Sequence, residues 1–117
     1  MKITNVRAVL LSRLHEPERQ WFSATFKSIK ADGVVVEIET DEGLKGIGEA
    51  CAYGGPVQIA AWVEWYKPDL VGSDPTRPDL PPHPNGRSHS HDAAVGGIDC
   101  ALWDLRGQIT GKPTAQL

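Results

Sequence analysis

The chain has 117 residues, the length of one ordinary domain, and its 40% hydrophobic and 23% charged residues are typical of a folded globular protein rather than a disordered one. Twelve basic and fifteen acidic residues give a formal net charge of -3. Because no Lys/Arg stripe runs along the chain, we expect no nucleic-acid partner. The apolar run Val9–Leu11 is too short for a signal peptide or a membrane span, so the sequence predicts a cytoplasmic protein with no membrane partner.

The first 32 residues divide into a strand and a long connection. Apolar residues occur at both odd and even positions of 2–14, which predicts a β-strand partly covered on both faces; they are Ile3, Val6, Val9, Leu10 and Leu11. Residues 15–32 carry mixed charge, Pro17 and the aromatic pair Trp21 and Phe22. This segment indicates a long connection whose structure the sequence does not specify.

Residues 34–51 predict a β-hairpin. Apolar residues at every second position define the buried face of its first strand: Val34, Val36 and Ile38. Gly43 can adopt the left-handed conformation that a short hairpin loop requires. Gly46 and Gly48 share one face of the return strand, and the missing side chains there predict a close approach by other backbone or by a ligand.

A first helix and an irregular segment follow the hairpin. Pro56 suits the first helical position, and Pro68 is expected to end the helix. The apolar residues between them recur at helical spacing: Ile59, Trp62, Val63 and Tyr66. Residues 72–90 contain five prolines and no periodicity, so we expect an irregular or disordered segment.

A second helix is predicted to start at Asp92 as its N-cap and to stop before Gly111. One apolar stripe runs along it: Val95, Ile98, Leu102, Leu105 and Ile109. Gly96 and Gly97 each cost about 1 kcal/mol relative to Ala inside a helix, which indicates that another element packs closely there. The predicted fold class is α+β, a three-stranded antiparallel meander followed by helices.

The two cysteines, Cys51 and Cys100, form neither a C-x-x-C pair nor a dense disulfide pattern. We expect both to be small, buried apolar residues rather than a disulfide or a reactive thiol.

Three segments resemble a known family. The run from Gly97 to Gly107 (GIDCALWDLRG), with Gly111-Lys112-Pro113 after it, is similar to the segment that leads into the barrel of mandelate racemase and muconate-lactonizing enzymes of the enolase superfamily. Residues 40–50 (TDEGLKGIGEA) resemble the hairpin of that family's amino-terminal domain, and 1–6 resemble its opening.

The resemblance implies a two-part enzyme. Residues 1–117 would form the amino-terminal capping domain, with 72–90 irregular and 91–117 a helix and connector leading to a TIM barrel that is absent from this sequence. In the family the barrel carries the catalytic groups and binds Mg²⁺, which stabilises the enolate formed when a proton is removed beside a carboxylate. We therefore expect no catalytic residue, no metal ligand and no bound cofactor in this chain, and no activity by itself.

The same resemblance implies a substrate class and candidate substrate-facing loops. A sugar acid or related small carboxylic acid would be bound only in the full-length context, through dehydration, racemisation or cycloisomerisation, among which this sequence does not choose. By position, Glu16–Phe26 and Ala52–Pro56 match the loops that reach over the barrel mouth. Trp21, Phe22 and Tyr53 are the candidate specificity residues, and ordinary packing within the domain is the equally weighted alternative.

Three acidic residues have a structural interpretation as well as a functional one. Asp99 and Asp104 lie in the second helix, where capping or pairing with neighbouring segments is favoured over catalysis. Glu49 follows two glycines near a candidate loop, and a structural role is favoured there too.

The histidines His83, His89 and His91, together with Asp92, raise the question of a metal site. Structural zinc needs four convergent ligands, commonly including cysteine, so a solvated loop is the favoured interpretation.

The alternative function is a non-catalytic interaction module that works as a homo-oligomer or supports a separate barrel. Its basis is the apolar stripe of the second helix and the face of the meander, which would otherwise be uncovered.

Overall fold

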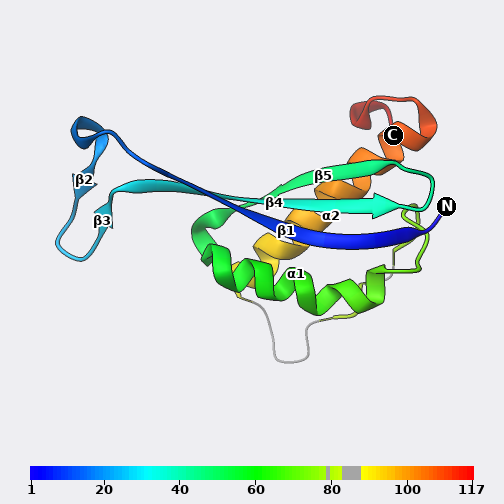
Figure 1. The fold of residues 1–117 in the computed structure, drawn as a ribbon, viewed down its shortest axis with the longest axis horizontal. Helices are drawn as coiled ribbons and strands as arrows, with labels where there is room; N and C mark the ends of the chain where they lie inside the picture. The colour runs from blue at the N-terminus through cyan, green and yellow to red at the C-terminus, as the bar shows by residue number, and fades with distance from the viewer. Residues whose placement is uncertain (79, 83–87) are drawn as a thin grey trace.

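The computed structural model describes residues 1–78, 80–82 and 88–117. An antiparallel sheet has the strand order β1-β4-β5 and consists of β1 (Ile3–Leu14), β4 (Lys30–Thr40) and β5 (Lys45–Ala50). The helices α1 (Pro56–Leu70) and α2 (His89–Thr110) lie against one face of this sheet (Figure 1). The predicted α+β meander followed by helices is confirmed.

The predicted hairpin forms between β4 and β5. Val36 pairs with Gly48 and Ile38 with Gly46, so the small residues of β5 and the apolar residues of β4 share the inner face of the sheet. The turn closes through a hydrogen bond from the Gly43 N–H to the Thr40 carbonyl (3.2 Å), and Gly43 has φ 82°. Glycine adopts that conformation without the steric cost that other residues bear.

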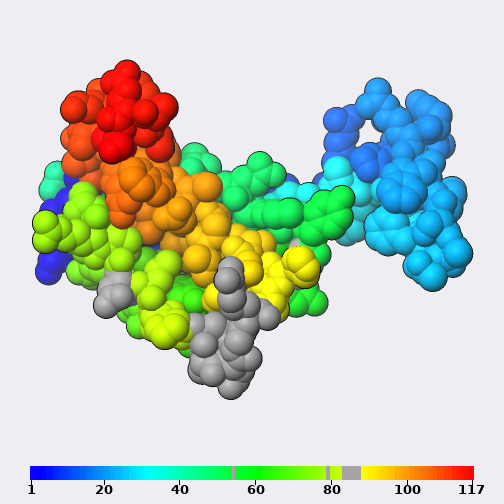
Figure 2. Space-filling model, turned by 180° about the vertical axis from the view of Figure 1, so that it is seen from behind, coloured from blue at the N-terminus to red at the C-terminus, as the bar shows by residue number. Residues whose placement is uncertain are grey.

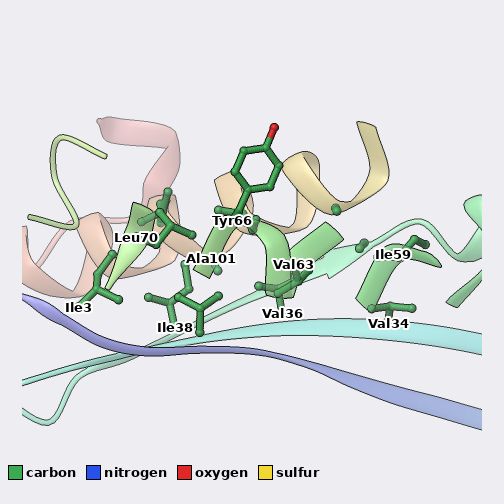
Figure 3. Close-up of a cluster of buried hydrophobic side chains, with 14 of the residues drawn as sticks. Ile3, Val34, Val36, Ile38, Ile59, Val63, Tyr66, Leu70 and Ala101 are labelled. Atoms are coloured by element: carbon green, nitrogen blue, oxygen red, sulfur yellow. The ribbon is translucent and has the colours of Figure 1, made fainter. Parts of the chain in front are cut away.

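The core lies between this inner face and the two helices (Figure 3). Its largest fully buried side chains come from every layer: Tyr66, Ile3, Ile38, Ile59, Leu70, Ile98, Leu102, Leu105, Val6, Val34, Val36 and Val63. Because Ile98, Leu102 and Leu105 are buried inside the chain, the stripe of α2 is unavailable for association with another molecule. That basis for the interaction-module alternative is wrong.

The two glycines of β5 allow the sheet and α2 to approach to backbone contact. A Cβ on Gly46 would overlap the Ala101 carbonyl oxygen, and a Cβ on Gly48 would overlap that of Gly97. Gly97 itself faces the sheet, where a Cβ would lie 2.8 Å from Val36 Cγ2. The predicted close approach is confirmed, and the approaching element is α2.

Two helix ends differ from the sequence prediction. Pro68 lies inside α1, where its missing N–H removes one backbone hydrogen bond in the last turn, and the buried Leu70 anchors the helix beyond it. The second helix begins at His89 because Ser88, rather than Asp92, is the N-cap: the Ser88 hydroxyl accepts a hydrogen bond from the His91 N–H (3.2 Å).

The start of the segment between the helices makes backbone hydrogen bonds to β1. The Gly72 N–H donates to the Ile3 carbonyl (2.8 Å) and the Ile3 N–H to the Ser73 carbonyl (3.0 Å), which pairs the start of the segment with the edge of β1. Residues 79 and 83–87, including His83, lie outside the described residues.

Beyond the helices, β1 and β4 continue as a two-stranded ribbon. Its two-stranded pairing runs from Leu11 opposite Gly33 to Leu14 opposite Lys30, and Leu11 and Leu14 are exposed. The expectation of a strand covered on both faces is wrong here, because neither helix reaches this far along the ribbon. Figure 2 shows the tip of the ribbon standing apart from the rest of the molecule.

Residues 15–32, whose structure the sequence did not specify, contain short regular elements. They contain the short helix η1 (Pro17–Arg19) and a small hairpin of β2 (Trp21–Phe22) and β3 (Lys27–Ser28). Two more single-turn helices, η2 (Ala52–Gly54) and η3 (Thr114–Gln116), follow β5 and α2 respectively.

Both cysteines are free and exposed, which corrects the prediction that they are buried. Cys51 follows the last residue of β5, and Cys100 lies on α2 with its Cβ next to Gly48 of β5. Cysteine type predicts burial only on average, whereas Cys51 lies at a strand end and Cys100 lies where α2 meets the edge strand β5. Among the described helices, none is long and apolar enough to cross a membrane.

Candidate functional site

The β2–β3 hairpin presents an aromatic tip built by its own local contacts. Trp21 pairs with Ser28 and Phe22 with Lys27 across the hairpin. The turn is closed by the Ser23 N–H, which donates to the Phe26 carbonyl (2.8 Å). Phe26 packs at 5.5 Å between ring centroids from Trp21, and the Lys27 ammonium lies 5.2 Å from the Phe22 ring centroid.

These aromatic side chains are exposed despite their size. Trp21 is 56% exposed and Phe22 62%. Exposed aromatic groups clustered on one element mark a surface that contacts something else. The alternative that Trp21 and Phe22 pack inside the domain core is therefore wrong for the described residues.

Tyr53 is the third candidate, and it projects from η2. Gly55 follows with φ 85°, and its N–H donates to the Ala52 carbonyl (3.0 Å), so the chain turns sharply before Pro56 begins α1. This turn leaves Tyr53 97% exposed. Like the hairpin tip, it offers an aromatic ring to the outside rather than to the core.

The two loops emerge at the same end of the sheet. The last residue of β5, Ala50, pairs with Val34, and the hairpin leaves β4 four residues away at Lys30, which corresponds to roughly 13 Å along a strand. The structure brings Trp21 and Phe22 together in one tip and leaves Tyr53 on a separate loop beside it. The contribution of all three to a substrate pocket remains a prediction.

Where the ribbon joins the tip, one carboxylate is held in its ionised form. The Ser12 hydroxyl donates to Asp32 Oδ1 (2.6 Å), and the Lys30 ammonium lies 3.2 Å from the same oxygen. The Ser12 hydrogen bond, followed by Lys30, lowers the pKa of Asp32. These contacts tie β1 to β4 at a point that no helix covers.

The outer face of the sheet is lined by opposite charges. Arg7 bonds Glu37 through Nε (2.6 Å), and Lys45 lies 3.1 Å from Glu39 Oε1 and 3.6 Å from Glu37 Oε2. The Lys45 hydrogen bond, with a weaker one from Asn5, lowers the pKa of Glu39. Such cross-strand pairs are the usual alternative to a covering layer on an open sheet face.

Asp104 has the structural role expected for it. Its Oδ2 accepts the free N–H of Ile47 (2.9 Å), and Gln108 Nε2 donates to the Lys45 carbonyl (2.7 Å). Together these side chains of α2 occupy the open edge of β5. Asp99, by contrast, is exposed and has no hydrogen bond or ion pair within the described residues, and Glu49 is exposed opposite Val35.

His91 belongs to a buried polar cluster rather than to a solvated loop. It is 7% exposed, its Nε2 lies 2.8 Å from the Tyr66 hydroxyl, and its Nδ1 lies 3.1 Å from Asp92 Oδ1. Burial raises the pKa of Tyr66, with smaller contributions from the carboxylates Asp69 and Asp92. The solvated-loop interpretation is wrong for His91 because Ser88 starts the helix early enough to turn this residue inward.

The described residues contain no cluster of candidate metal ligands. Nowhere in the described ranges do three side chains of the His, Cys, Asp or Glu type converge closely enough to hold an ion. The Mg²⁺ that the family resemblance implies therefore finds no ligand set in this part of the chain, and we derive no chemical step through it here.

The comparisons with known proteins point to one family. The model for the mandelate racemase / muconate lactonizing enzyme N-terminal domain matches residues 9–117. The chain belongs to this family. The match covers the ribbon, the hairpin tip, η2 and α2, which are the elements that carry the candidate site.

Two curated relatives and one solved structure show how the chain relates to longer proteins. It is 34% identical to cis-3-hydroxy-L-proline dehydratase of Roseibium aggregatum, over 97% of this chain and 33% of the relative. It is also 34% identical to D-galactarolactone cycloisomerase of Agrobacterium fabrum, over 100% of this chain and 32% of the relative. A structure of the mandelate racemase/muconate lactonizing type from Roseovarius nubinhibens ISM, complexed with magnesium, is similar with a TM-score of 0.73 and 25% identity, over 99% of this chain and 33% of that one. The chain spans about a third of the length of these proteins.

Sequence reasoning missed two members of the aromatic tip. Phe26 and Lys27 complete it by packing on Trp21 and Phe22 respectively. A local signal for both was present: an aromatic pair and a second aromatic residue separated by Ser-Ala-Thr, which is compatible with a tight hairpin.

Proposed function

We propose that this domain is the capping and substrate-specificity part of an enzyme that removes a proton beside a carboxylate, acting with a TIM barrel. The substrate would be a sugar acid or a related small carboxylic acid, and the reaction a dehydration, racemisation or cycloisomerisation. The dehydratase and cycloisomerase among the relatives support this class of chemistry. In this proposal residues 1–117 form one capping domain, with 91–117 as helix and connector toward the barrel.

The observation that carries the proposal is the pair of exposed aromatic loops at one end of the sheet. Trp21 and Phe22 on one loop and Tyr53 on the other have no packing role in the core, yet each loop has a defined turn that fixes its direction. An aromatic lid of this kind excludes water from a reacting centre and contacts the side groups of a substrate.

The proposal assigns the proton-abstracting base and the metal ligands to the barrel. Removing a weakly acidic proton leaves negative charge that a divalent cation and positioned donors must neutralise as it forms. By itself the 117-residue chain is therefore proposed to be inactive. An assay for Mg²⁺-dependent exchange of the α-proton of D-galactarolactone or cis-3-hydroxy-L-proline tests this directly, and exchange above background contradicts it.

The role of the loops is tested in a fusion of this chain to the part of the Agrobacterium cycloisomerase that lies beyond the matched third. We expect Trp21→Ala and Tyr53→Ala each to raise KM for D-galactarolactone about tenfold, the size of one lost aromatic contact. Trp65→Ala is the matched control, because Trp65 is an exposed aromatic residue on α1, away from both loops. Equal effects of all three substitutions would show that the loops do not contact substrate.

Self-association is a second proposed property. Leu11, Leu14 and Val57 are exposed near the aromatic tip and the start of α1, in addition to the aromatic residues. Apolar surface of this kind favours contact with another protein surface. We expect light scattering at micromolar concentration to give a dimer or larger assembly; a monomeric mass contradicts it.

A further inference from the structure

Tyr66 of α1 and His91 of α2 form a buried polar contact between the two helices. Tyr66 is 2% exposed and His91 7%. The Tyr66 hydroxyl points away from the strands (Figure 3) and lies 2.8 Å from His91 Nε2, in the first turn of α2. The Trp62 ring packs edge-on against the His91 ring, at 5.2 Å between centroids. Because water is largely excluded, the hydrogen bonds of this pair must be made within the protein.

The contact of His91 with Asp92 determines which ring nitrogen carries hydrogen. His91 Nδ1 lies 3.1 Å from Asp92 Oδ1. An ionised carboxylate only accepts hydrogen bonds, so Nδ1 carries the hydrogen of this contact. A neutral imidazole has a single N–H, which leaves Nε2 as an acceptor. When His91 is neutral, the Tyr66 hydroxyl is therefore the donor in the bond between the helices.

The same hydroxyl has a second acceptor in the segment between α1 and α2. The Pro81 carbonyl oxygen lies 3.4 Å from the Tyr66 oxygen. A tyrosine hydroxyl has one hydrogen to donate, so strong donation to His91 and strong donation to Pro81 exclude each other. The shorter distance, 2.8 Å, assigns the hydrogen to His91 Nε2 and leaves the Pro81 carbonyl as the weaker acceptor.

Uptake of a proton by His91 reverses the direction of its bond to Tyr66. An imidazolium donates from both ring nitrogens, so a proton taken from solvent makes Nε2–H a donor to the Tyr66 oxygen. The hydroxyl hydrogen then turns toward another acceptor, and the Pro81 carbonyl is already within reach. One proton thus exchanges donation from Tyr66 to His91 for donation from Tyr66 to Pro81, while the contact between the helices persists.

Charged groups on both helices surround this contact. Asp92 lies against His91 Nδ1, so an imidazolium here is paired rather than isolated. The first turn of α2 acts in the opposite sense, because a helix dipole disfavours a cation at the N-terminal end. Burial raises the pKa of Tyr66, and the carboxylates of Asp69 on α1 and Asp92 on α2 add to this effect. Tyr66 therefore keeps its hydrogen between about pH 5 and pH 8, the range in which histidines change charge.

We propose that Tyr66, His91 and Asp92 form a proton-operated switch that fastens the segment between the two helices at Pro81. With His91 neutral, the Tyr66 hydroxyl donates to His91. With His91 protonated, it donates to the Pro81 carbonyl and holds this segment more firmly against α1. The inference is independent of the proposed function, because it uses only contacts within this chain.

NMR spectroscopy of the 117-residue chain, labelled with ¹⁵N and ¹³C, tests the switch between pH 8 and pH 5. At pH 8 we expect the ¹⁵N shifts of an unprotonated nitrogen at Nε2 and of an N–H at Nδ1. As His91 titrates, the carbonyl carbon of Pro81 should move downfield with the same midpoint, because its oxygen gains a hydrogen bond. An Nε2–H tautomer at pH 8 overturns the proposal, and so does a Pro81 carbonyl that does not follow His91.

Two substitutions separate the switch from a general effect of acid. Tyr66→Phe keeps the ring but removes the hydroxyl, so His91 should still titrate while the shift of the Pro81 carbonyl is lost. Tyr53→Phe is the matched control, because this tyrosine is 97% exposed, and the shift should remain. His91→Gln keeps a hydrogen-bonding side chain that does not titrate, and it should hold the Pro81 carbonyl at one position. A shift that persists in Tyr66→Phe or in His91→Gln contradicts the switch.

Discussion

At the end of the sheet that contains Ile3 and Ile38, two helices cover the inner face of the strands, and their side chains are fully buried. At the other end the same two strands, β1 and β4, remain paired out to Leu14 and Lys30, but their apolar residues are exposed. The backbone hydrogen bonds between β1 and β4 therefore run along the whole length of both strands, whereas the helices pack on only one end of them. The hydrogen-bond ladder thus extends the sheet into a projecting arm, whereas the helices cover only the end that contains the core.

The largest difference in stability is expected when one apolar side chain is shortened at the helix-covered end of the sheet and another at the projecting end. Ile38→Ala should lower the free energy of unfolding by about 2–5 kcal/mol, because it leaves a cavity between the sheet and the helices. Leu14→Ala, at a side chain that is 68% exposed, should change it by less than about 0.5 kcal/mol. Urea unfolding followed by circular dichroism measures both. Equal losses would mean that the ribbon is packed in solution.

Two adjacent glycines of α2 differ in the same way, because Gly97 faces the sheet and Gly96 faces away from it. Gly97→Ala should destabilise the chain by about 1–3 kcal/mol, since the new Cβ would lie 2.9 Å from Ala50 Cβ. Gly96→Ala should stabilise it by about 1 kcal/mol, because the position is open and alanine favours the helix. Thermal unfolding of the two variants under identical conditions gives the signs. The same sign for both would contradict the orientation of α2 on the sheet.

The polar contact between Tyr66 of α1 and His91 of α2 predicts a smaller, pH-dependent effect on stability. Tyr66→Phe should cost about 1 kcal/mol at neutral pH by removing the hydrogen bond to His91. Burial raises the pKa of Tyr66 above its usual value of 10.0, so its stabilisation is fully present below that value and is lost as the pH rises through it. The Tm measured from pH 8 to pH 11 should therefore fall more steeply for the original chain than for Tyr66→Phe. Parallel curves would argue that the hydroxyl is solvated.

The smallest effect on the Tm is expected from Glu39 on the outer face of the sheet. The pKa of Glu39 is lowered from its usual 4.5, so its contribution is present above that value and is lost as the pH falls through the lowered pKa. Glu39→Gln should make the Tm less sensitive to acid between pH 6 and pH 3. Because Glu39 and Lys45 are exposed, 1 M salt should reduce the difference by screening. A difference unaffected by salt would contradict a simple surface ion pair.

Much of the helix-covered half could be predicted from local patterns. The alternation of Val34, Val36 and Ile38 identified the inner face of β4, and Gly43 identified the turn. The glycines of β5 correctly indicated a close approach. These predictions succeeded because the residues of one strand face that are apolar or small in sequence are also the residues that the helices cover.

The exposure of the projecting end of β1 and the first residue of α2 could not be predicted from local patterns. The apolar residues Leu10, Leu11 and Leu14 resemble core residues in sequence, because residue type does not tell how far a covering helix extends. Ser88 and Asp92 are both good N-caps, and the choice between them depends on whether His91 can be buried beside Tyr66. That contact joins two residues 25 positions apart in the chain, so a pattern in neighbouring residues cannot predict it.

Neighbouring residues and the periods of strands and helices set which side chains share a face, where the hairpin turns and in which order the family motifs occur. Which faces are covered depends on how distant segments pack. The exposure of Cys51 and Cys100, the burial of His91 and the contrast between Gly96 and Gly97 all follow from how α1 and α2 are placed on the sheet. Placement depends on the packing of segments distant in sequence, and burial is a property of that packing rather than of any residue taken alone.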